Sequence, residues 1–432
     1  MIGLAARPDF WSRPRSSPES IRQYQDSRIR HLVTHAWDNV PFYRRRFEAA
    51  GVHPRDIRGA ADLTSIPVLH KSDLRESFDD FLARGTDLAS CNMHNSSGTT
   101  GEPVRIVRTR REEHALLAVR LRAQVLSGLR PWDLRMKIGS PPALAWPHRI
   151  GLFRCTSVSE LEPPAFILSR LKNQRPSVIY SAPGILGMLL TPAGEVRLRA
   201  LCPRLIFTGG ELLSRQMRAK LQEVFGCPVV DFYGAVEFNL IAWECRSCGL
   251  YHTCDDSVLV EVLKDDGSPA GPGEQGRLVA TALHSVAFPL LRYEVGDVVR
   301  KPLRAPSCAI RFASIDRILG RMADYLLLPN GHRLSPHRLE EVTDDVPGLR
   351  RFQFVQTGPS EILFRIQPGK EFTGDSLHLL RRNLAALLPP GLRVEIRAVE
   401  EIALTPAGKH KVVQAWRDSG TEAPVPPAGE DR

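Results

Sequence analysis

The chain has 432 residues, of which 43% are hydrophobic and 25% are charged, and its net charge is +10 at pH 7. This length predicts two domains, and the composition is that of a globular protein. No apolar run approaches the ~18 residues that cross a bilayer, and residues 1–15 lack the continuous apolar core of a signal peptide. These features exclude a membrane-spanning protein and predict a cytoplasmic location.

The excess of basic residues leaves two interpretations open, a solvated surface or the attraction of polyanionic small molecules such as nucleotides. These residues are spread along the chain, in places such as Arg44–Arg46 and Arg108–Arg111. No basic tract is interleaved with aromatic residues, so we expect no nucleic-acid partner, and the lack of long apolar runs argues against a membrane partner.

The N-terminal part is predicted to be helical. Apolar residues recur at helical spacing over residues 20–50, and Pro41 interrupts this pattern, so two helices are expected there. Ser72 or Asp73 is expected to cap the next helix, and residues 111–128 predict a further helical stretch.

From about residue 176 the pattern alternates between strand and helix. Three strands are predicted, at residues 177–180, 205–208 and 228–233. A helix is predicted over residues 212–225, with Ser214 as its cap and Gly226 just past its end. This order indicates an α/β fold with parallel sheets and crossover helices, in which ligands bind at the carboxyl ends of strands.

The remainder of the chain predicts a β-rich part followed by a smaller unit. Residues 258–303 are expected to be strands, and a boundary is expected near residues 318–324. A compact mixed segment of helices and strands is predicted from about 325 to 418. Residues 419–432, rich in Pro, Gly, Ala and Glu, predict a disordered tail.

A glycine- and hydroxyl-rich stretch follows the first predicted part, with the sequence Ser96, Ser97, Gly98, Thr99, Thr100 and Gly101. Glycine lets the backbone approach a ligand closely, and backbone N–H groups with hydroxyls can surround phosphate oxygens. The stretch is therefore either a phosphate-binding loop or a solvated turn.

Two further segments lie at predicted strand ends. Gly209, Gly210 and Glu211 form either a plain strand-to-helix turn or a backbone platform for an adenine ring. The second segment contains Asp231, Phe232, Tyr233, Gly234 and, after two residues, Glu237. Tyr233 either stacks on a purine or packs in the core, and the Glu237 carboxylate is suited to a magnesium ion that neutralises phosphate charge.

Three later residues are candidates for nucleotide contacts. Asp297 follows Gly296 and is either a turn aspartate or an acceptor for the hydroxyls of a ribose. Arg321 follows Gly320 at the proposed boundary and offers a planar donor fork to phosphate or ribose. Lys409 lies on a loop with Gly408 and is either an exposed lysine or one that swings into a distant site.

Of the eight cysteines, three cluster within ten residues, at Cys245, Cys248 and Cys254, with His252 between them. Cys-x-x-Cys spacing places two thiolates on one tetrahedral ion, and on a strand His252 and Cys254 face the same side. The sequence therefore favours a structural zinc site over buried or free thiols.

Together these segments resemble the adenylate-forming superfamily, and most closely its phenylacetate–coenzyme A ligase branch. Residues 35–44 (HAWDNVPFYR) and the segment from Ile66 to Leu74 are also similar to that branch. The resemblance covers about residues 20 to 416. It implies a large N-terminal AMP-binding domain (residues 1–319), a hinge (residues 320–324) and a small mobile C-terminal domain (residues 325–418).

The resemblance further implies a two-step reaction and a role for each candidate residue. A carboxylic acid, aromatic or arylacetic, would react with ATP to give an acyl-adenylate and pyrophosphate, and coenzyme A would then displace AMP. Residues 96–101 would hold the β and γ phosphates, the segments at 209–211 and 231–234 would bracket adenine, Glu237 would bind magnesium, and Asp297 the ribose. Lys409 would bridge the carboxylate and the α-phosphate during adenylation.

Other implications concern the zinc site and the oligomer. Some members of this branch carry a structural zinc with a cysteine from the segment before the hinge, and Cys308 stands at about that place, so five residues compete for four ligand positions. Members of the branch are often homodimers, which is the expectation here.

The chain departs from the superfamily pattern at three positions. Val236 and Val295 stand where threonine is common, and Ala323 stands where the hinge usually has aspartate, although Asp324 is adjacent. Losing one hydroxyl contact costs ~1 kcal/mol, or about fivefold in rate. Three hypotheses therefore stay open: a coenzyme A ligase, an adenylate-forming enzyme that passes the acyl group to an amine or a carrier protein, and a nucleotide-binding homologue with weak or lost catalysis.

Overall fold

The computed structural model describes residues 8–95, 104–140, 150–329, 333–343, 345–403 and 411–416. The chain divides into two units, one formed by Met1–Leu129 with Phe232–Arg317 and the other by Arg130–Asp231 with Ile318–Arg432. The expected domains, residues 1–319 and 325–418, are continuous in sequence, whereas each of these two units combines two separate segments. The expected domain limits stay a prediction. The predicted phosphate loop (residues 96–101), Lys409 and the tail (residues 419–432) lie outside the described residues.

The first unit begins with helices, as the apolar spacing predicts. Pro41 is the first residue of its helix and ends the preceding one, because proline lacks the N–H that a helix interior needs. The expected cap at Ser72 or Asp73 is wrong: His70 is the N-cap, and Asp73 accepts a hydrogen bond from its backbone N–H at 2.8 Å. The helices of this unit are α2 (Pro8–Ser12), α3 (Pro18–Asn39), α4 (Pro41–Ala49), α5 (Lys71–Glu76) and α6 (Arg110–Leu126).

The strands of the first unit belong to three sheets. Strands β1 (Cys91–Asn95) and β2 (Arg105–Thr109) form a two-stranded ribbon. The predicted β-rich part is confirmed, with β11 (Gln275–Ala282) pairing with both β10 (Val258–Leu263) and β12 (Tyr293–Arg300). The last residues of β7 (Val229–Tyr233) pair with β8 (Ala242–Glu244), followed by β9 (Tyr251–Thr253) and β13 (Ser314–Ile315).

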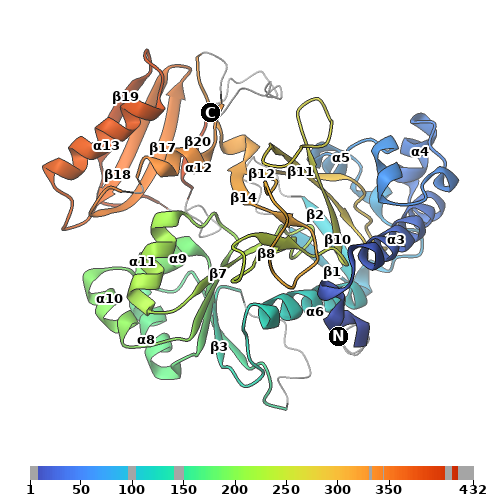
Figure 1. Cartoon of the computed structure of the whole chain (residues 1–432), viewed down its shortest axis with the longest axis horizontal. Coiled ribbons are helices and arrows are strands. Elements are labelled where there is room, and N and C mark those ends of the chain that lie inside the picture. The colour runs from blue at the N-terminus through green and yellow to red at the C-terminus, as the bar shows by residue number, and fades with distance from the viewer. Residues whose placement is uncertain are drawn as a thin grey trace. The chain divides into compact units, whose positions relative to one another are not determined.

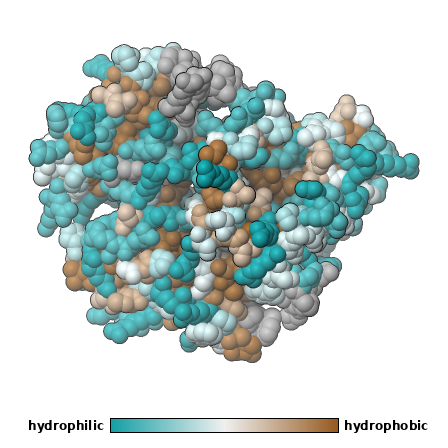
Figure 2. Space-filling model, in the orientation of Figure 1, coloured by the Kyte–Doolittle hydropathy of each residue, from teal (hydrophilic) through white to brown (hydrophobic). Residues whose placement is uncertain are grey.

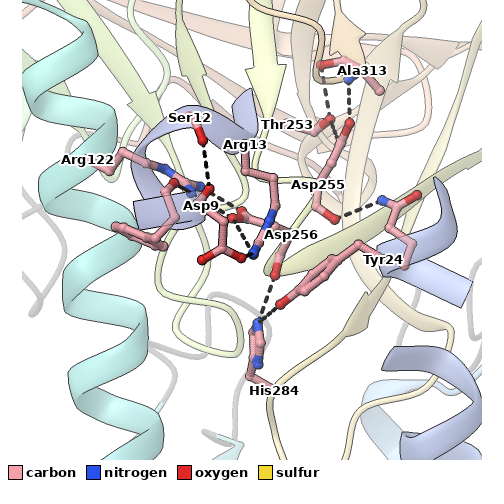
Figure 3. A network of polar contacts seen from close by, with 12 residues as sticks. Asp9, Ser12, Arg13, Tyr24, Arg122, Thr253, Asp255, Asp256, His284 and Ala313 are labelled. Carbon is pink, nitrogen blue, oxygen red and sulfur yellow. Dashed lines mark hydrogen bonds and ion pairs between the residues drawn. The ribbon is translucent and has the colours of Figure 1, made fainter. Parts of the chain in front are cut away.

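A buried ion-pair network anchors the N-terminal segment to this unit (Figure 3). Arg122 of α6 makes two contacts of 2.6 Å with the Asp256 carboxylate and donates to the carbonyl of Phe10 at 2.7 Å. Arg13 lies 3.6 Å from the same carboxylate. Because both guanidinium groups are buried with Asp256, removing one partner would leave an uncompensated charge in the interior.

The second unit contains a parallel sheet with crossover helices, as predicted. Strand order in this part is β4, β3, β5, β6, and then the first residues of β7. Apolar residues of α8, α9 and α11 share one buried cluster with β3, β5 and β6. The elements are β3 (Arg135–Ile138), β4 (Cys155–Val158), α8 (Pro164–Gln174), β5 (Val178–Ser181), α9 (Pro183–Leu189), α10 (Pro192–Arg199), β6 (Leu205–Gly209) and α11 (Arg215–Phe225).

The C-terminal part of the second unit has its own sheet and core. Its sheet has the order β19, β18, β17, β20, and α13 packs on one face of it (Figure 1). Leu380 and Leu384 of α13 share a buried cluster with Phe354 and Phe364 of the sheet. The elements are β14 (Arg317–Arg321), β15 (Leu326–Leu327), β16 (Arg333–Leu334), α12 (Pro336–Glu341), β17 (Leu349–Gly358), β18 (Glu361–Pro368), α13 (Gly374–Leu387), β19 (Arg393–Ala398) and β20 (Val413–Gln414).

Short 3-10 helices complete the described elements, at Arg13–Arg15, Pro54–Asp56, Ala60–Ser65, Phe78–Phe81, Leu88–Ser90 and Met322–Asp324. Hydrophilic side chains cover much of the face seen in Figure 2, with smaller hydrophobic areas between them. None of the described helices is long and apolar enough to cross a membrane.

Candidate functional site

In the first unit, Tyr233 and Asp297 are hydrogen-bonded to each other. The Tyr233 hydroxyl donates to Oδ2 of Asp297 at 2.6 Å, and each residue is only 8% exposed. Tyr233 ends β7 and Asp297 lies on β12, so the fold brings together two residues that were predicted separately as nucleotide contacts. A buried carboxylate that accepts a hydrogen bond from a hydroxyl keeps its orientation. It is then suited to accept a second, specific hydrogen bond.

Glu237 is held in the same way by the same strand. The Tyr293 hydroxyl donates to Oε1 of Glu237 at 2.9 Å, and both side chains are buried. Tyr293 and Asp297 are four residues apart on β12, and their partners Glu237 and Tyr233 are also four residues apart. No role was predicted for Tyr293; its only signal in the sequence is its place four residues before Asp297.

Backbone geometry explains the glycine between these two contacts. A Cβ at Gly234 would lie 2.2 Å from the carbonyl oxygen of Asn239, so no larger residue fits. Phe232, the residue before Tyr233, is buried and pairs with Trp243 of β8. Gly234 therefore permits the turn that brings Glu237 back toward β12.

A second missed residue, Arg108, lies beside Glu237. Its guanidinium donates to the backbone carbonyl of Val236, and its Nη1 is 3.7 Å from Oε2 of Glu113. The same Glu113 oxygen is 3.0 Å from Nε2 of His94. The sequence signal for Arg108 was its position on the strand directly after the predicted phosphate loop.

In the second unit, the segment at 209–211 lies at the end of β6, where it was predicted. Gly210 has φ +87°, a left-handed conformation that favours glycine, and a Cβ there would meet nothing within 4 Å. Oε2 of Glu211 accepts a hydrogen bond from the backbone N–H of Gly184 at 2.7 Å, at the start of α9. Gly209 is the last residue of the strand.

Asp231 of the second unit holds two strand ends together. Its Oδ1 accepts a hydrogen bond of 2.6 Å from the hydroxyl of Thr208, and both side chains are buried. Thr208 lies on β6 beside the predicted platform of Gly209 and Gly210. This contact gives Asp231 a structural task at the place where the sequence predicted an adenine contact.

The predicted hinge contains an unusual glycine and an ion pair. Gly320 has φ +107°, and a Cβ there would lie 2.8 Å from the ring of Pro336. Arg321 ends β14, and the 3-10 helix that follows contains Ala323 and Asp324. Oδ1 of Asp324 is 3.4 Å from Nζ of Lys411, the first described residue after the loop of Lys409.

A small cavity in the first unit lies against Glu237. Its polar lining includes Glu112, Ser257 and His284. Burial lowers the pKa of His284, which also contacts the Tyr24 hydroxyl at 3.2 Å (Figure 3).

Four of the five predicted zinc ligands form a cluster in the first unit. The ligand atoms of Cys245, Cys248, His252 and Cys308 all lie within 4.8 Å of one another. Cys254 is fully buried and is not part of this group, because β9 ends at Thr253 and the alternation that placed Cys254 beside His252 ends with it.

The cluster is suited to a tetrahedral ion. Nδ1 of His252 lies 3.2 Å from the carbonyl of Phe312, a contact that leaves Nε2 directed at the thiols, 3.1 Å from Sγ of Cys308 and 3.7 Å from Sγ of Cys248. Burial lowers the pKa of His252, which favours the neutral imidazole that binds metals. Ligands at about 2.0–2.3 Å from zinc are themselves roughly 3.3–3.8 Å apart, and the distances of 3.1 Å and 3.7 Å from Nε2 of His252 to the two thiols are close to that spacing.

The chain matches the AMP-binding enzyme family over residues 22–284, more than half of its length. The protein belongs to this family. It is 28% identical over 439 residues to the phenylacetate–coenzyme A ligase of Thermus thermophilus, covering 93% of this chain and 96% of that protein. The phenylacetate–coenzyme A ligase of Escherichia coli is 29% identical over 76% of each chain.

A solved structure supports the fold assigned to this family member. The crystal structure of 2-hydroxyisobutyryl-CoA ligase with its acyl-AMP, in the postadenylation state, has a TM-score of 0.79 at 19% identity. The match covers 93% of this chain and 90% of that one. The α/β architecture predicted from the sequence is therefore confirmed.

Proposed function

We propose that this AMP-binding enzyme activates a carboxylic acid with ATP and transfers the acyl group to coenzyme A. The observation that carries the proposal is the match to a phenylacetate–coenzyme A ligase over 93% of this chain and 96% of the relative, which leaves no large part of either protein unmatched. The geometry around Glu237 and Asp297 agrees with it, since both carboxylates are held in place by tyrosine hydroxyls of the same unit.

The reaction has two balanced steps. In the first, a carboxylate oxygen attacks the α-phosphorus of ATP, the bond from that phosphorus to the bridging oxygen breaks, and pyrophosphate leaves with the bonding electrons. In the second, the sulfur of coenzyme A attacks the acyl carbon, loses its proton, and AMP leaves. Two anions must meet in the first step, so positive charge is needed where negative charge accumulates.

The nucleotide roles are proposals for individual residues. Asp297 accepts hydrogen bonds from the ribose hydroxyls. The Tyr233 hydroxyl orients the Asp297 carboxylate, and the Tyr233 ring stacks on adenine. Gly209, Gly210 and Glu211 give the adenine its platform, with Arg321 as a donor to phosphate or ribose. Residues 96–101 hold the β and γ phosphates, and Lys409 bridges the carboxylate and the α-phosphate.

Glu237 is the residue that would hold magnesium. One buried carboxylate oriented by Tyr293 fits an ion that takes one or two protein carboxylates and completes its shell with substrate phosphates and water. The ion would neutralise phosphate charge, and the Tyr293 hydroxyl keeps the Glu237 carboxylate in one orientation.

The zinc cluster has a structural task in this proposal. Cys245, Cys248, His252 and Cys308 make a closed four-ligand set, which leaves no position for a substrate. The set ties the turn between β8 and β9 to the segment that precedes β13. Cytoplasmic location and a homodimer remain predictions from the sequence.

An exchange assay tests the function. The purified protein is incubated with ATP, labelled pyrophosphate and, in turn, aromatic, arylacetic and short aliphatic acids, and label in ATP reports adenylate formation. We expect exchange with an aromatic or arylacetic acid, and thioester formation when coenzyme A is added. Acyl transfer only to an amine or a carrier protein would redirect the proposal to a different acceptor, and no exchange with any acid would refute it.

A further inference from the structure

Arg108 is a buried cation on the strand that follows the predicted phosphate loop. Only 3% of the residue is exposed, and it lies on β2, whose partner β1 precedes that loop. His94 of β1 and Arg108 of β2 both contact the same oxygen of Glu113 on α6. Glu113 therefore ties together the two strands that flank residues 96–101.

The second terminal nitrogen of the Arg108 guanidinium reaches the segment of Glu237. Its Nη2 donates to the carbonyl of Val236, the residue immediately before Glu237. Arg108 thus links the strand after the phosphate loop to the backbone that carries the proposed magnesium ligand. The hydrogen bond from the Arg108 guanidinium restrains that carbonyl.

The charges around Arg108 favour this arrangement. Burial lowers the pKa of Arg108, and the nearby carboxylates of Glu113, Glu237 and Glu112 oppose that effect. Glu112 is already engaged, since it accepts from the backbone N–H groups of Thr109, Val286 and Ala287. Of these three carboxylates, Glu237 is the one proposed to bind magnesium, and its Oε1 accepts a hydrogen bond from the Tyr293 hydroxyl.

The side chain of Val236 cannot itself fix the backbone that Arg108 contacts. The Val236 side chain is apolar and has no hydroxyl that could donate or accept a hydrogen bond. The backbone of Val236 therefore cannot be steadied by a ligand contact of its own side chain. A charged donor on its carbonyl supplies that restraint from the protein side, and a hydrogen bond to a charged group is stronger than one between neutral groups.

We propose that Arg108 is a positioning residue for the adenylation step: by holding the Val236 carbonyl, it sets the Glu237 carboxylate for magnesium–ATP. This inference rests on the proposed function and deepens it. Arg108 acts through Val236 and Glu237, so its loss weakens the metal–nucleotide complex more than it weakens binding of the acid.

The test compares Arg108→Met, which removes the charge and the donors, with Arg108→Lys, which keeps the charge but lacks the planar fork. Arg111→Met, an exposed arginine at the start of α6, is the matched control. Calorimetry measures binding of ATP at fixed Mn²⁺ and at fixed Mg²⁺, and pyrophosphate exchange measures the Mg²⁺ concentration at half-maximal rate and the KM for the acid.

We expect Arg108→Met to weaken metal–ATP binding about 10- to 100-fold, the factor that corresponds to the loss of such a hydrogen bond. The KM for the acid should change less than twofold, Arg108→Lys should lie between wild type and Arg108→Met, and Arg111→Met should match wild type. Metal–ATP affinity of Arg108→Met within twofold of wild type would overturn the inference. If Arg108→Met does not fold, unchanged affinity in the folded Arg108→Lys variant overturns it equally.

The binding measurement separates this inference from the function on which it rests. Wild-type protein that binds metal–ATP, with the expected loss in Arg108→Met, supports the positioning role even if no acid supports exchange. In that case the proposed ligase activity fails alone. Normal exchange with unchanged metal–ATP binding in Arg108→Met means that the positioning role fails alone.

Discussion

The hydroxyl of Tyr233 lies 2.6 Å from Oδ2 of Asp297, so the end of β7 and the middle of β12 share one buried hydrogen bond. The donor is neutral and the acceptor is a carboxylate, which makes the bond stronger than one between two neutral groups. One oxygen of Asp297 is thereby fixed in direction, and so is the plane of the carboxylate that the proposed ribose contact needs.

Removing this bond should weaken nucleotide binding without abolishing it. We expect Tyr233→Phe to raise the Kd for AMP about 5- to 10-fold, because the ring stays but the orienting hydroxyl is lost. Asp297→Asn should raise it more, since it changes the acceptor itself. Calorimetry with AMP measures both, and the double variant should be less than additive. Equal affinity of Tyr233→Phe and wild type would contradict an orienting role for the tyrosine.

Glu237→Gln should strongly reduce the rate of pyrophosphate exchange and should change the stability of the fold little. A neutral amide is a poor ligand for magnesium, so the requirement for Mg²⁺ should rise by an order of magnitude or more. Tyr293→Phe should have a smaller effect in the same direction, because Oε1 of Glu237 loses one donor. Mg²⁺ titrations of the exchange rate check both variants, and a larger loss for Tyr293→Phe than for Glu237→Gln would contradict the assignment.

Lys409→Ala should separate the two half-reactions. The loss of a cation between two reacting anions should reduce the rate of adenylation by roughly two orders of magnitude or more. The thioester step, started from a supplied acyl-adenylate, should stay within a few fold of wild type. Arg382→Ala, at a position on α13, serves as a control for removing one positive charge from the C-terminal part. Equal loss of both half-reactions would refute the role of Lys409.

The zinc proposal makes opposite predictions for two cysteines. Cys308→Ser should lower the bound zinc per chain and the thermal stability, because Cys308 belongs to the four-residue cluster. Cys254→Ser should retain zinc, since Cys254 lies outside that cluster, although burial of a hydroxyl in place of the thiol lowers stability there as well. Elemental analysis of both variants decides. Retention of zinc by Cys308→Ser with loss by Cys254→Ser would reverse the ligand set.

Local signals predicted the elements well, and contacts distant in sequence explain the failures. Ser214 and Gly226 flank α11 as its N-cap and C-cap, as expected. Both caps could be predicted because a capping hydroxyl and a left-handed glycine depend only on a few adjacent residues. The spacing near His252 left Cys254 and Cys308 as competing ligands, whereas the pairing of β9 with β13 brings in the segment after Cys308. Arg108 was missed for a similar reason, since its partner Val236 is 128 residues away.

The pKa of His70, which pairs with Glu294 of β12, should lie above its ordinary value. Nδ1 of His70 is 3.2 Å from Oε2 of Glu294, and this hydrogen bond raises the pKa of His70 although partial burial opposes it. The stabilisation is fully present below the unfolded pKa of His70, near 6.5, and is lost as the pH rises through the higher folded value. The stability difference between wild type and His70→Gln should therefore be larger at low pH than at high pH.

The measurement has a direct and an indirect readout. NMR titration of the His70 ring should give a pKa above 6.5, and Glu294→Gln should move it down, because the amide removes the negative charge that favours the imidazolium. Denaturant unfolding at about two pH units on each side of neutrality gives the stability difference. Glu294 also accepts from Arg277 at 2.9 Å, so Glu294→Gln lowers stability at both pH values, and only the part that disappears at high pH belongs to His70. A His70 pKa unchanged by Glu294→Gln would show that the pair does not control this titration.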